Sequence, residues 1–403
     1  MKITYITTQA PFGQGETFVT EEMLAVVKLG NEILIVPRSA SKEIFHDFGK
    51  QLVDYTIRFP LFNLRILFAL MKTTVVKPRL WRVLAKILFT SRSPKILVKN
   101  LVVLPKAVFI SDLLYQARVQ HIHAHWGSTT STMAYIISQL TGIPWSFTLH
   151  RWDISENNML KEKTRTAKFV RVISKDGYNE VLGIIGNEYK NKCLVLHMGV
   201  DISKFIKSGE KTFERDKDGF IIAIPANLVE KKGHKYLVKA IETLKKKGYN
   251  NIKCYFFGDG LLREELEKIV NKMNLGDVIV FKGAIPHEKL LELYSNREID
   301  CVVLPSIVTE DGEKEGIPVS LIEAMAYKIP VISTNTGGIP ELLDNDAGII
   351  VEQRNSYELA EAIETLIKDE GLRRKLGESG YKKVMEEFSL PNIVTKLLEL
   401  MRE

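Results

Sequence analysis

Cysteine and long apolar stretches are both scarce in this sequence. Three of its 403 residues are cysteines, and they stand far apart: Cys193, Cys254 and Cys301. Such spacing excludes a disulfide framework and a cysteine-based zinc site, and it is typical of a reducing cytosol. The most apolar stretch, 61–71, contains Arg65 and has about half the length of a membrane-spanning helix. We therefore expect a cytoplasmic protein with neither a spanning helix nor a signal-peptide core.

Acidic residues are almost missing from one segment, and this asymmetry sets the charge of the whole chain. Between Arg58 and Arg118 there are twelve Lys and Arg residues against one acid, Asp112. The segment carries +11 in a protein whose net charge is +7, so the remainder carries −4. With 45% hydrophobic and 26% charged residues the chain is otherwise ordinary, which excludes disorder and a collagen-like fibre. The basic segment therefore needs a local explanation.

Short Val- and Ile-rich segments alternate with amphipathic helical patterns through two stretches of the chain. This rhythm predicts parallel sheets covered by helices on both faces, and hence an α/β protein with two doubly wound, Rossmann-like domains facing each other across a cleft. We place the first domain at 1–200, the second at 201–385, and a final helix in 386–403 that is free to pack back on the first domain. The polar run 207–218 is typical of an exposed linker. The expected strands are Ile3–Thr8, Glu32–Pro37, His121–His125, Trp145–Leu149, Val170–Ser174, Cys193–His197, Phe220–Ile224, Lys253–Phe257, Val278–Phe281, Cys301–Leu304 and Val331–Ser333.

The segment with the most chemical information runs from Glu315 to Glu323 and reads Glu-Gly-Ile-Pro-Val-Ser-Leu-Ile-Glu. Pro318 suits the first turn of a helix, where the missing N–H removes no hydrogen bond. The amides of Val319 and Ser320 would then be free donors at the positive end of the helix, a site suited to phosphate. Two acids alone are ordinary on a solvated helix, but the Gly-Ile-Pro between them makes the pattern more specific.

Further motifs accompany this segment along the chain. They are Gly15-Glu-Thr-Phe-Val19, His121-Ile-His-Ala-His125, Ser146-Phe-Thr-Leu-His150, His197-Met-Gly-Val-Asp201, Asn227-Leu-Val-Glu-Lys-Lys232-Gly-His, Phe257-Gly-Asp-Gly, Phe281-Lys-Gly-Ala-Ile-Pro-His-Glu, Val302-Val-Leu-Pro-Ser306 and Gly337-Gly-Ile-Pro-Glu-Leu. Together and in this order, they resemble the motifs of the retaining nucleotide-sugar glycosyltransferases of family 4, which have the two-domain GT-B fold. The motif that begins at Gly15 is similar to that of the subgroup that assembles bacterial exopolysaccharides. The likeness covers most of the chain and is weak in residues 30–118.

The resemblance implies a role for each matching residue. Glu315 and His150 would be catalytic residues that contact the transferred sugar, and Glu323 would bind the ribose hydroxyls of the nucleotide. Lys232 would neutralise the diphosphate leaving group, for which a point-charge ammonium is suited. The remaining donor-binding residues would be Gly15, Asn227, Gly258, Gly316, Ile317, Pro318, Val319 and Ser320.

One position departs from the family pattern, which usually has Arg where this chain has Asn227. Either Lys231, Arg151 or Arg263 supplies the missing charge, or donor binding is weaker. The function implied is transfer of a sugar, with retention, from a nucleotide diphosphate-sugar to a lipid-linked glycan or surface polysaccharide (a hexosyltransferase-type activity). The alternatives are a catalytically silent nucleotide- or glycan-binding protein of the same fold and a sugar-nucleotide epimerase.

No metal and no cofactor is expected. His121, His123 and His125 alternate and share one face of a strand, and imidazoles do ligate zinc, but their place in the family motif already accounts for them. The chain has no Asp-x-Asp pattern for a divalent cation, so we expect metal-independent transfer. Gly258-Asp-Gly260 lacks the third glycine of a dinucleotide-binding loop, because Arg263 stands there.

The basic segment 58–118 interleaves its cations with Leu, Ile, Phe and Trp side chains. Arg79, Arg82 and Lys86 recur three and four residues apart, as one face of a helix requires. This is the composition of an amphipathic helix that docks on an anionic membrane surface, so a peripheral location on the inner face of the cell membrane is expected. The alternative is a solvated basic rim on helices that pack against the first domain. Nucleic acid is not expected, since no recognised binding fold accompanies the charge.

Overall fold

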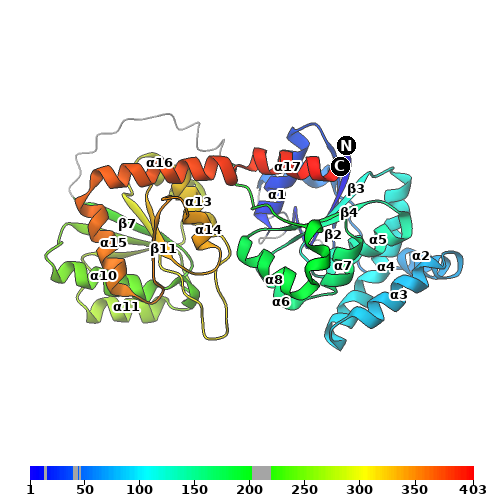
Figure 1. The fold of residues 1–403 in the computed structure, drawn as a ribbon, viewed down its shortest axis with the longest axis horizontal. Helices are drawn as coiled ribbons and strands as arrows, with labels where there is room; N and C mark the ends of the chain where they lie inside the picture. The colour runs from blue at the N-terminus through cyan, green and yellow to red at the C-terminus, as the bar shows by residue number, and fades with distance from the viewer. Residues whose placement is uncertain (13–15, 40–43, 45–46, 202–218) are drawn as a thin grey trace. The chain divides into compact units, whose positions relative to one another are not determined.

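A computed structural model describes residues 1–12, 16–39, 44, 47–201 and 219–403 of the chain. These residues form two compact units (Figure 1): the first comprises Met1–Gly199 together with Leu390–Glu403, and the second comprises Val200–Ser389. The expected linker run 207–218 lies outside the described residues.

The first unit is built on a parallel six-stranded sheet with the order β2-β1-β3-β4-β5-β6. Its strands are almost wholly buried, as in sheets that helices cover on both faces. Chain order reverses direction between β1 and β3, and the carboxyl edge at such a switch point is where doubly wound sheets bind ligands. The strands are β1 (Lys2–Thr7), β2 (Glu32–Pro37), β3 (His121–His125), β4 (Trp145–Leu149), β5 (Phe169–Val172) and β6 (Cys193–Val195).

Two apolar layers cover this sheet. On one face α1 (Thr17–Lys28) packs with α17 (Leu390–Arg402), whose Leu390, Ile393, Val394, Leu397, Leu398 and Met401 are buried. On the other face α4 (Pro94–Gln116), α5 (Thr129–Thr141) and α8 (Lys175–Ile185) contribute to a second core cluster. The unit also contains η1 (Asp47–Tyr55), α2 (Leu64–Val76), α3 (Arg79–Thr90), α6 (Arg151–Glu156), α7 (Leu160–Thr166) and η2 (Asn187–Lys192).

The second unit has the same design, with the sheet order β12-β11-β10-β7-β8-β9 and the switch point between β7 and β10. Its strands are β7 (Phe220–Pro225), β8 (Ile252–Phe257), β9 (Ile279–Gly283), β10 (Cys301–Leu304), β11 (Val331–Thr334) and β12 (Ile349–Val351). Around this sheet α10 packs on α15 and α13 packs on α16. The helices are η3 (Glu230–Lys232), α10 (His234–Lys246), α11 (Arg263–Lys272), α12 (His287–Ser295), α13 (Val319–Ala326), α14 (Ile339–Leu343), α15 (Ser356–Lys368) and α16 (Glu370–Glu387).

The structure corrects the sequence prediction at Pro318. We expected this proline inside the first helical turn, but α13 begins one residue later, at Val319. Pro318 stands before the helix with extended backbone angles (φ −72°, ψ 118°), and its carbonyl accepts the amides of Leu321 and Ile322. The strand β12 was not predicted, because a three-residue segment after a Gly-containing turn has too little pattern to detect.

No described helix combines the length and the apolar character needed to cross a membrane.

Candidate active site

At the switch point of the second unit, the structure brings together two residues that are far apart in sequence. Lys232 ends η3, which follows β7, and Glu315 follows β10, the neighbouring strand. The Lys232 Nζ atom lies 3.0 Å from Oε1 of Glu315, and only 18% and 9% of the two side chains are exposed. Among the described residues, this carboxylate is the ion-pair partner of the largely buried Lys232 ammonium.

Two glycines allow the turns that carry this pair to approach each other through backbone contacts. A Cβ atom on Gly233 (φ +70°) would lie 1.8 Å from the Pro305 carbonyl oxygen in the loop after β10. A Cβ on Gly337 (φ +56°) would lie 1.9 Å from the carbonyl oxygen of Glu315. Both positions require glycine for its conformation and for its lack of a side chain, so these turns fix where Lys232 and Glu315 stand.

Glu323 lies inside α13 and is also largely buried. Its Oε1 is 2.8 Å from Nε2 of His287, the first residue of α12. The sequence motif that contains His287 was recognised, but its contact with a residue 36 positions away was not predicted. No local sequence pattern predicts this contact, because it depends on how α12 and α13 pack against each other.

The remaining donor-binding residues predicted in the second unit lie in loops that follow its strands or in the first turn of α13. Asn227 is exposed in the loop after β7. Gly258 follows β8, where a Cβ would meet the Ala226 carbonyl oxygen at 2.1 Å. In the turn 316–320, the Gly316 carbonyl accepts the Gly338 amide at 3.2 Å. Gly15 lies outside the described residues.

The charge that Asn227 does not supply has three candidate sources, and they differ in how they are paired. Arg151 belongs to the first unit and contacts Asp176 at 3.0 Å and Glu180 at 2.7 Å. Arg263 lies 3.2 Å from Asp259 and 2.9 Å from Glu267. Lys231 is next to Lys232, and its ion pair with Glu313 is longer, at 3.8 Å. Of the three cations, Lys231 therefore has the longest ion pair.

His150, the second predicted catalytic residue, follows β4 at the carboxyl edge of the first unit's sheet. Its ring is buried, with the Trp126 ring centroid 4.3 Å away and that of Phe18 5.3 Å away. Burial, and then the nearby His125 and Arg171, hold the pKa of His150 well below its usual range. Its Nε2 atom has no hydrogen-bond partner among the described residues. His150 thus offers a neutral imidazole with an unused polar atom.

Glu16 organises the loop beside His150, a role that the sequence did not reveal. One carboxylate oxygen accepts the Trp126 indole N–H at 2.6 Å and the amide of Thr8 at 3.1 Å. The other oxygen accepts the amides of Gln9 at 2.6 Å and Ala10 at 2.7 Å. Because all four partners are donors, the carboxylate fixes both the loop after β1 and the ring that covers His150.

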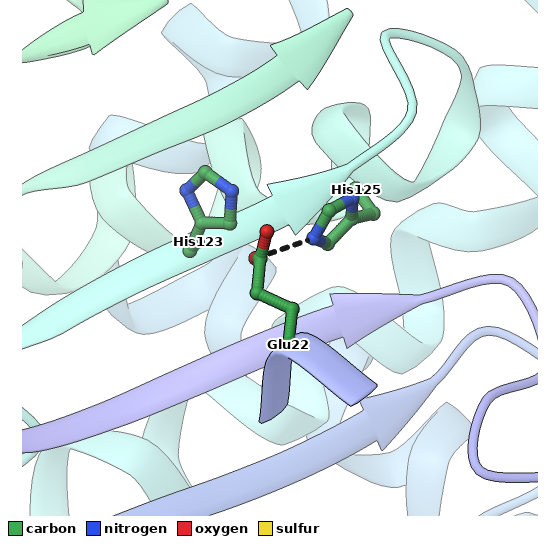
Figure 2. A group of neighbouring side chains, drawn as sticks. All are labelled: Glu22, His123 and His125. Carbon is green, nitrogen blue, oxygen red and sulfur yellow. Dashed lines mark hydrogen bonds and ion pairs between the residues drawn. The ribbon is translucent and has the colours of Figure 1, made fainter. Parts of the chain in front are cut away.

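A buried charged network links α1 to the sheet near His150, whose ring centroid is 5.9 Å from that of His125. Figure 2 shows Glu22, His123 and His125 of this region. Glu22 of α1 is 2.9 Å from Nε2 of His125 and 2.5 Å from the guanidinium of Arg171. Arg171 also donates to the carbonyls of Leu196, at 2.8 Å, and His197. Burial alone would raise the pKa of Glu22, but the charges of Arg171 and His125 outweigh it and hold this pKa well below its usual range. The carboxylate is therefore ionised and fully partnered.

Within the described chain, Glu22, His123 and His125 are a group whose possible metal-ligand atoms all lie within 4.8 Å of one another. Their existing bonds do not suit a cation. Both ring nitrogens of His123 contact hydroxyls, of Ser146 at 2.8 Å and Thr148 at 2.9 Å, and the guanidinium of Arg171 already neutralises Glu22. A metal ion would have to displace these bonds and lie beside a fixed positive charge.

Comparison with known proteins is consistent with this geometry. Residues 206–383 match the family model for group 1 glycosyl transferases. The amylovoran biosynthesis glycosyltransferase AmsK of Erwinia amylovora is 26% identical over 100% of this chain and 99% of its own length. The putative colanic acid biosynthesis glycosyltransferase WcaL of Escherichia coli K12 is 34% identical over 43% of this chain and 42% of its own.

Solved structures share the fold of this chain over its full length. A glycosyltransferase from Rickettsia africae ESF-5 superposes with a TM-score of 0.71 at 19% identity, covering 100% of this chain and 98% of that one. The Anabaena protein Alr3699/HepE in complex with UDP gives a TM-score of 0.71 at 16% identity, with 100% of both chains covered. The chain therefore has the two-domain GT-B fold, and its relatives support a glycosyltransferase role.

Proposed function

We propose that the protein is a retaining glycosyltransferase that moves a sugar from a nucleotide diphosphate-sugar to a lipid-linked glycan or surface polysaccharide. The observation that carries this proposal is the Lys232–Glu315 pair, largely buried and 3.0 Å apart at the switch point of the second unit. It combines one cation for a departing diphosphate with one carboxylate for sugar hydroxyls.

The proposed chemistry is mainly electrostatic. As the bond between sugar and diphosphate breaks, negative charge develops on the leaving group. Lys232 and the first amides of α13, those of Val319 and Ser320, are the donors we assign to it, because the first amides of a helix have no partner within the helix. Glu315 and the neutral His150 would hydrogen-bond sugar hydroxyls, and Glu323 the ribose. The acceptor hydroxyl would then attack from the face that the diphosphate leaves, with retention, and its proton would pass to the departing diphosphate.

Metal independence is part of the same proposal. A divalent cation commonly neutralises a diphosphate leaving group, and here Lys232 would serve that purpose, with Lys231 beside it in place of the usual arginine at position 227. The neighbouring amides add neutral donors without any counter-ion.

The acceptor would be reached at the inner face of the cell membrane. The relatives named above act, by their names, in amylovoran and colanic acid biosynthesis, and both are consistent with a polysaccharide acceptor for this chain. We propose that Arg79, Arg82 and Lys86, all exposed on α3, attract the protein to anionic lipid.

A panel of nucleotide sugars, incubated with the protein and extracted membrane lipids in excess EDTA, tests this function. We expect one donor to release its nucleotide and label a lipid-linked product, and NMR of that product to show the donor's anomeric configuration. Inversion would contradict retention, and activity restored only by a divalent cation would contradict metal independence. Binding without release would favour the silent protein, and an isomerised donor without acceptor would favour the epimerase.

A further inference from the structure

The outer face of α2 is apolar along its whole length. Leu64, Leu67, Phe68, Met71 and Val75 follow one another at intervals of three, one, three and four residues, so at 3.6 residues per turn they form one stripe. Their exposed fractions are 86%, 43%, 69%, 69% and 85%. The opposite side of the helix already packs inward, through Ile66 and Thr73. The described residues of the first unit therefore leave this second apolar face of the helix largely exposed.

The next helix, α3, repeats this arrangement. Leu80, Val83 and Ile87 are buried, whereas Trp81, Leu88 and Phe89 are 59%, 56% and 83% exposed. On a helical wheel the three exposed apolar residues span about 100°, and Arg79, Arg82 and Lys86 occupy the arc between them and the buried side. On α2, Arg65 and Lys72 border the apolar stripe in the same way. We call the exposed apolar residues of α2 and α3 the apolar face: Leu64, Leu67, Phe68, Met71, Val75, Trp81, Leu88 and Phe89.

An exposed apolar surface of this extent marks an interaction site, because soluble proteins seldom leave one uncovered. Its charge selects among possible partners. From Arg58 to Ser111 the chain has eleven Lys and Arg residues and no acid, and Asp112 is paired with Lys77 at 2.8 Å. A second copy of the chain would bring two such positive surfaces together. An anionic bilayer instead offers apolar chains to the stripe and negative headgroups to the cations beside it.

We propose that the apolar face inserts into the interfacial layer of an anionic membrane, so that α2 and α3 lie in the plane of the surface with their side chains below the headgroups. The reason for such docking rests on the proposed function, since a lipid-linked acceptor lies there. The insertion itself does not depend on catalysis. It differs from attraction by Arg79, Arg82 and Lys86 alone, which high salt would screen.

The test uses the full chain and vesicles of equal parts phosphatidylcholine and phosphatidylglycerol. The triple variant Phe68→Ser, Met71→Ser and Phe89→Ser removes three exposed apolar side chains and keeps every charge. A matched control, Leu261→Ser, changes a residue of the second unit that is 96% exposed. We expect the parent and the control to sediment with vesicles even in high salt, and the triple variant to bind at least tenfold more weakly.

The fluorescence of Trp81 measures how deeply the apolar face inserts into the membrane. Lipids brominated near the headgroup should quench the fluorescence of the bound parent, and Trp81→Phe should remove most of that quenching. Equal vesicle binding by parent and triple variant, or quenching unchanged in Trp81→Phe, would overturn the proposal. So would a dimer, measured without vesicles, that the triple variant abolishes, because the face would then serve a second copy.

Release of nucleotide from a donor, measured without membranes, separates this proposal from the proposed function. If the triple variant keeps the parent's rate of release but loses vesicle binding, both stand. If neither protein acts on any donor while the parent still inserts, the proposed function fails and the insertion remains.

Discussion

Lys232 and Glu315 should have opposite effects on nucleotide binding, although they are ion-paired in the free protein. Replacing Lys232 by Met removes a charge-assisted hydrogen bond to the diphosphate, which contributes about 1.5–3 kcal/mol. At about 1.4 kcal/mol per factor of ten, affinity for UDP should fall roughly 10- to 150-fold. The change also leaves Glu315 unpaired beside the ligand.

Glu315→Gln should strengthen the binding of UDP. A phosphate oxygen bonded to Lys232 comes within about 6 Å of the Glu315 carboxylate, because the 3.0 Å ion pair adds to a hydrogen bond of about 2.9 Å. At an effective dielectric constant of about 20, two such charges repel by roughly 3 kcal/mol. In the variant Lys232 has lost its ion-pair partner, and ordering its side chain on the phosphate costs about 1–2 kcal/mol of the binding free energy. The net gain is roughly 5- to 30-fold in affinity, while sugar transfer is lost.

Isothermal titration calorimetry with UDP, and with GDP and ADP in case the base differs, measures both effects. Lys239→Met and Glu264→Gln are matched controls, since both residues are exposed on helices of the same unit. The double variant completes a cycle that isolates the coupling of the two residues. If both single variants weaken binding equally, or neither changes it, the pair does not face the diphosphate.

Four shorter predictions concern the first unit. Glu16→Gln should disrupt this loop, because the new amide nitrogen would face N–H donors. We expect at least a tenfold lower turnover and an altered Trp126 fluorescence signal. Trp126→Phe keeps the carboxylate, so its turnover should fall less. Arg171→Met leaves Glu22 buried without its cation and should lower the free energy of unfolding by about 3–5 kcal/mol in urea titrations, while the double variant with Glu22→Gln should recover much of it. Burial lowers the pKa of His121 to about 3 and is the chief cause that lowers the pKa values of His123 and His150. Because these histidines then bind protons only when unfolded, the free energy of unfolding should fall below about pH 6.5 by up to about 1.4 kcal/mol per histidine per pH unit. A flat profile between pH 6.5 and 5 would contradict neutral histidines. Glu substitutions at Arg79, Arg82 and Lys86 together should slow capture by anionic vesicles most strongly at low salt, and sedimentation equal to the parent would reject electrostatic docking.

The strands were the most predictable part of the fold. Glu32–Pro37, His121–His125, Trp145–Leu149 and Cys301–Leu304 have the bounds that the sequence indicated. Parallel strands buried on both faces are often short apolar runs between polar breaks, but His121–His125, with three histidines, is recognisable by its motif instead. Where the run continued past the sheet, as at His197, the prediction was too long: β6 ends at Val195. The carbonyl of His197 instead accepts a hydrogen bond from Arg171.

The candidate site was predictable only where a motif carries it. Lys232 and Glu315 were named by their motifs, but their ion pair, like the contact of Glu323 with His287, depends on packing between distant turns. Glu16 belongs to the recognised motif Gly15–Val19, but its role was not predicted, because its four donors come from residues that only the fold assembles. The apolar face of α2 was hidden for a different reason. Both sides of that helix are apolar, so periodicity reveals a helix without indicating which side is buried.

The chain enters the second unit at Val200 and returns to the first at Leu390, and this routing has a consequence for synthesis. A ribosome makes the roughly 190 intervening residues in about 10–40 s at ~5–20 residues per second. Throughout that time the layer of the first unit that α17 covers has no α17 to cover it, so apolar residues such as Val19 and Ile35 lack part of their native packing. The second unit can finish folding before the first, which reverses the usual order in which domains mature on the ribosome.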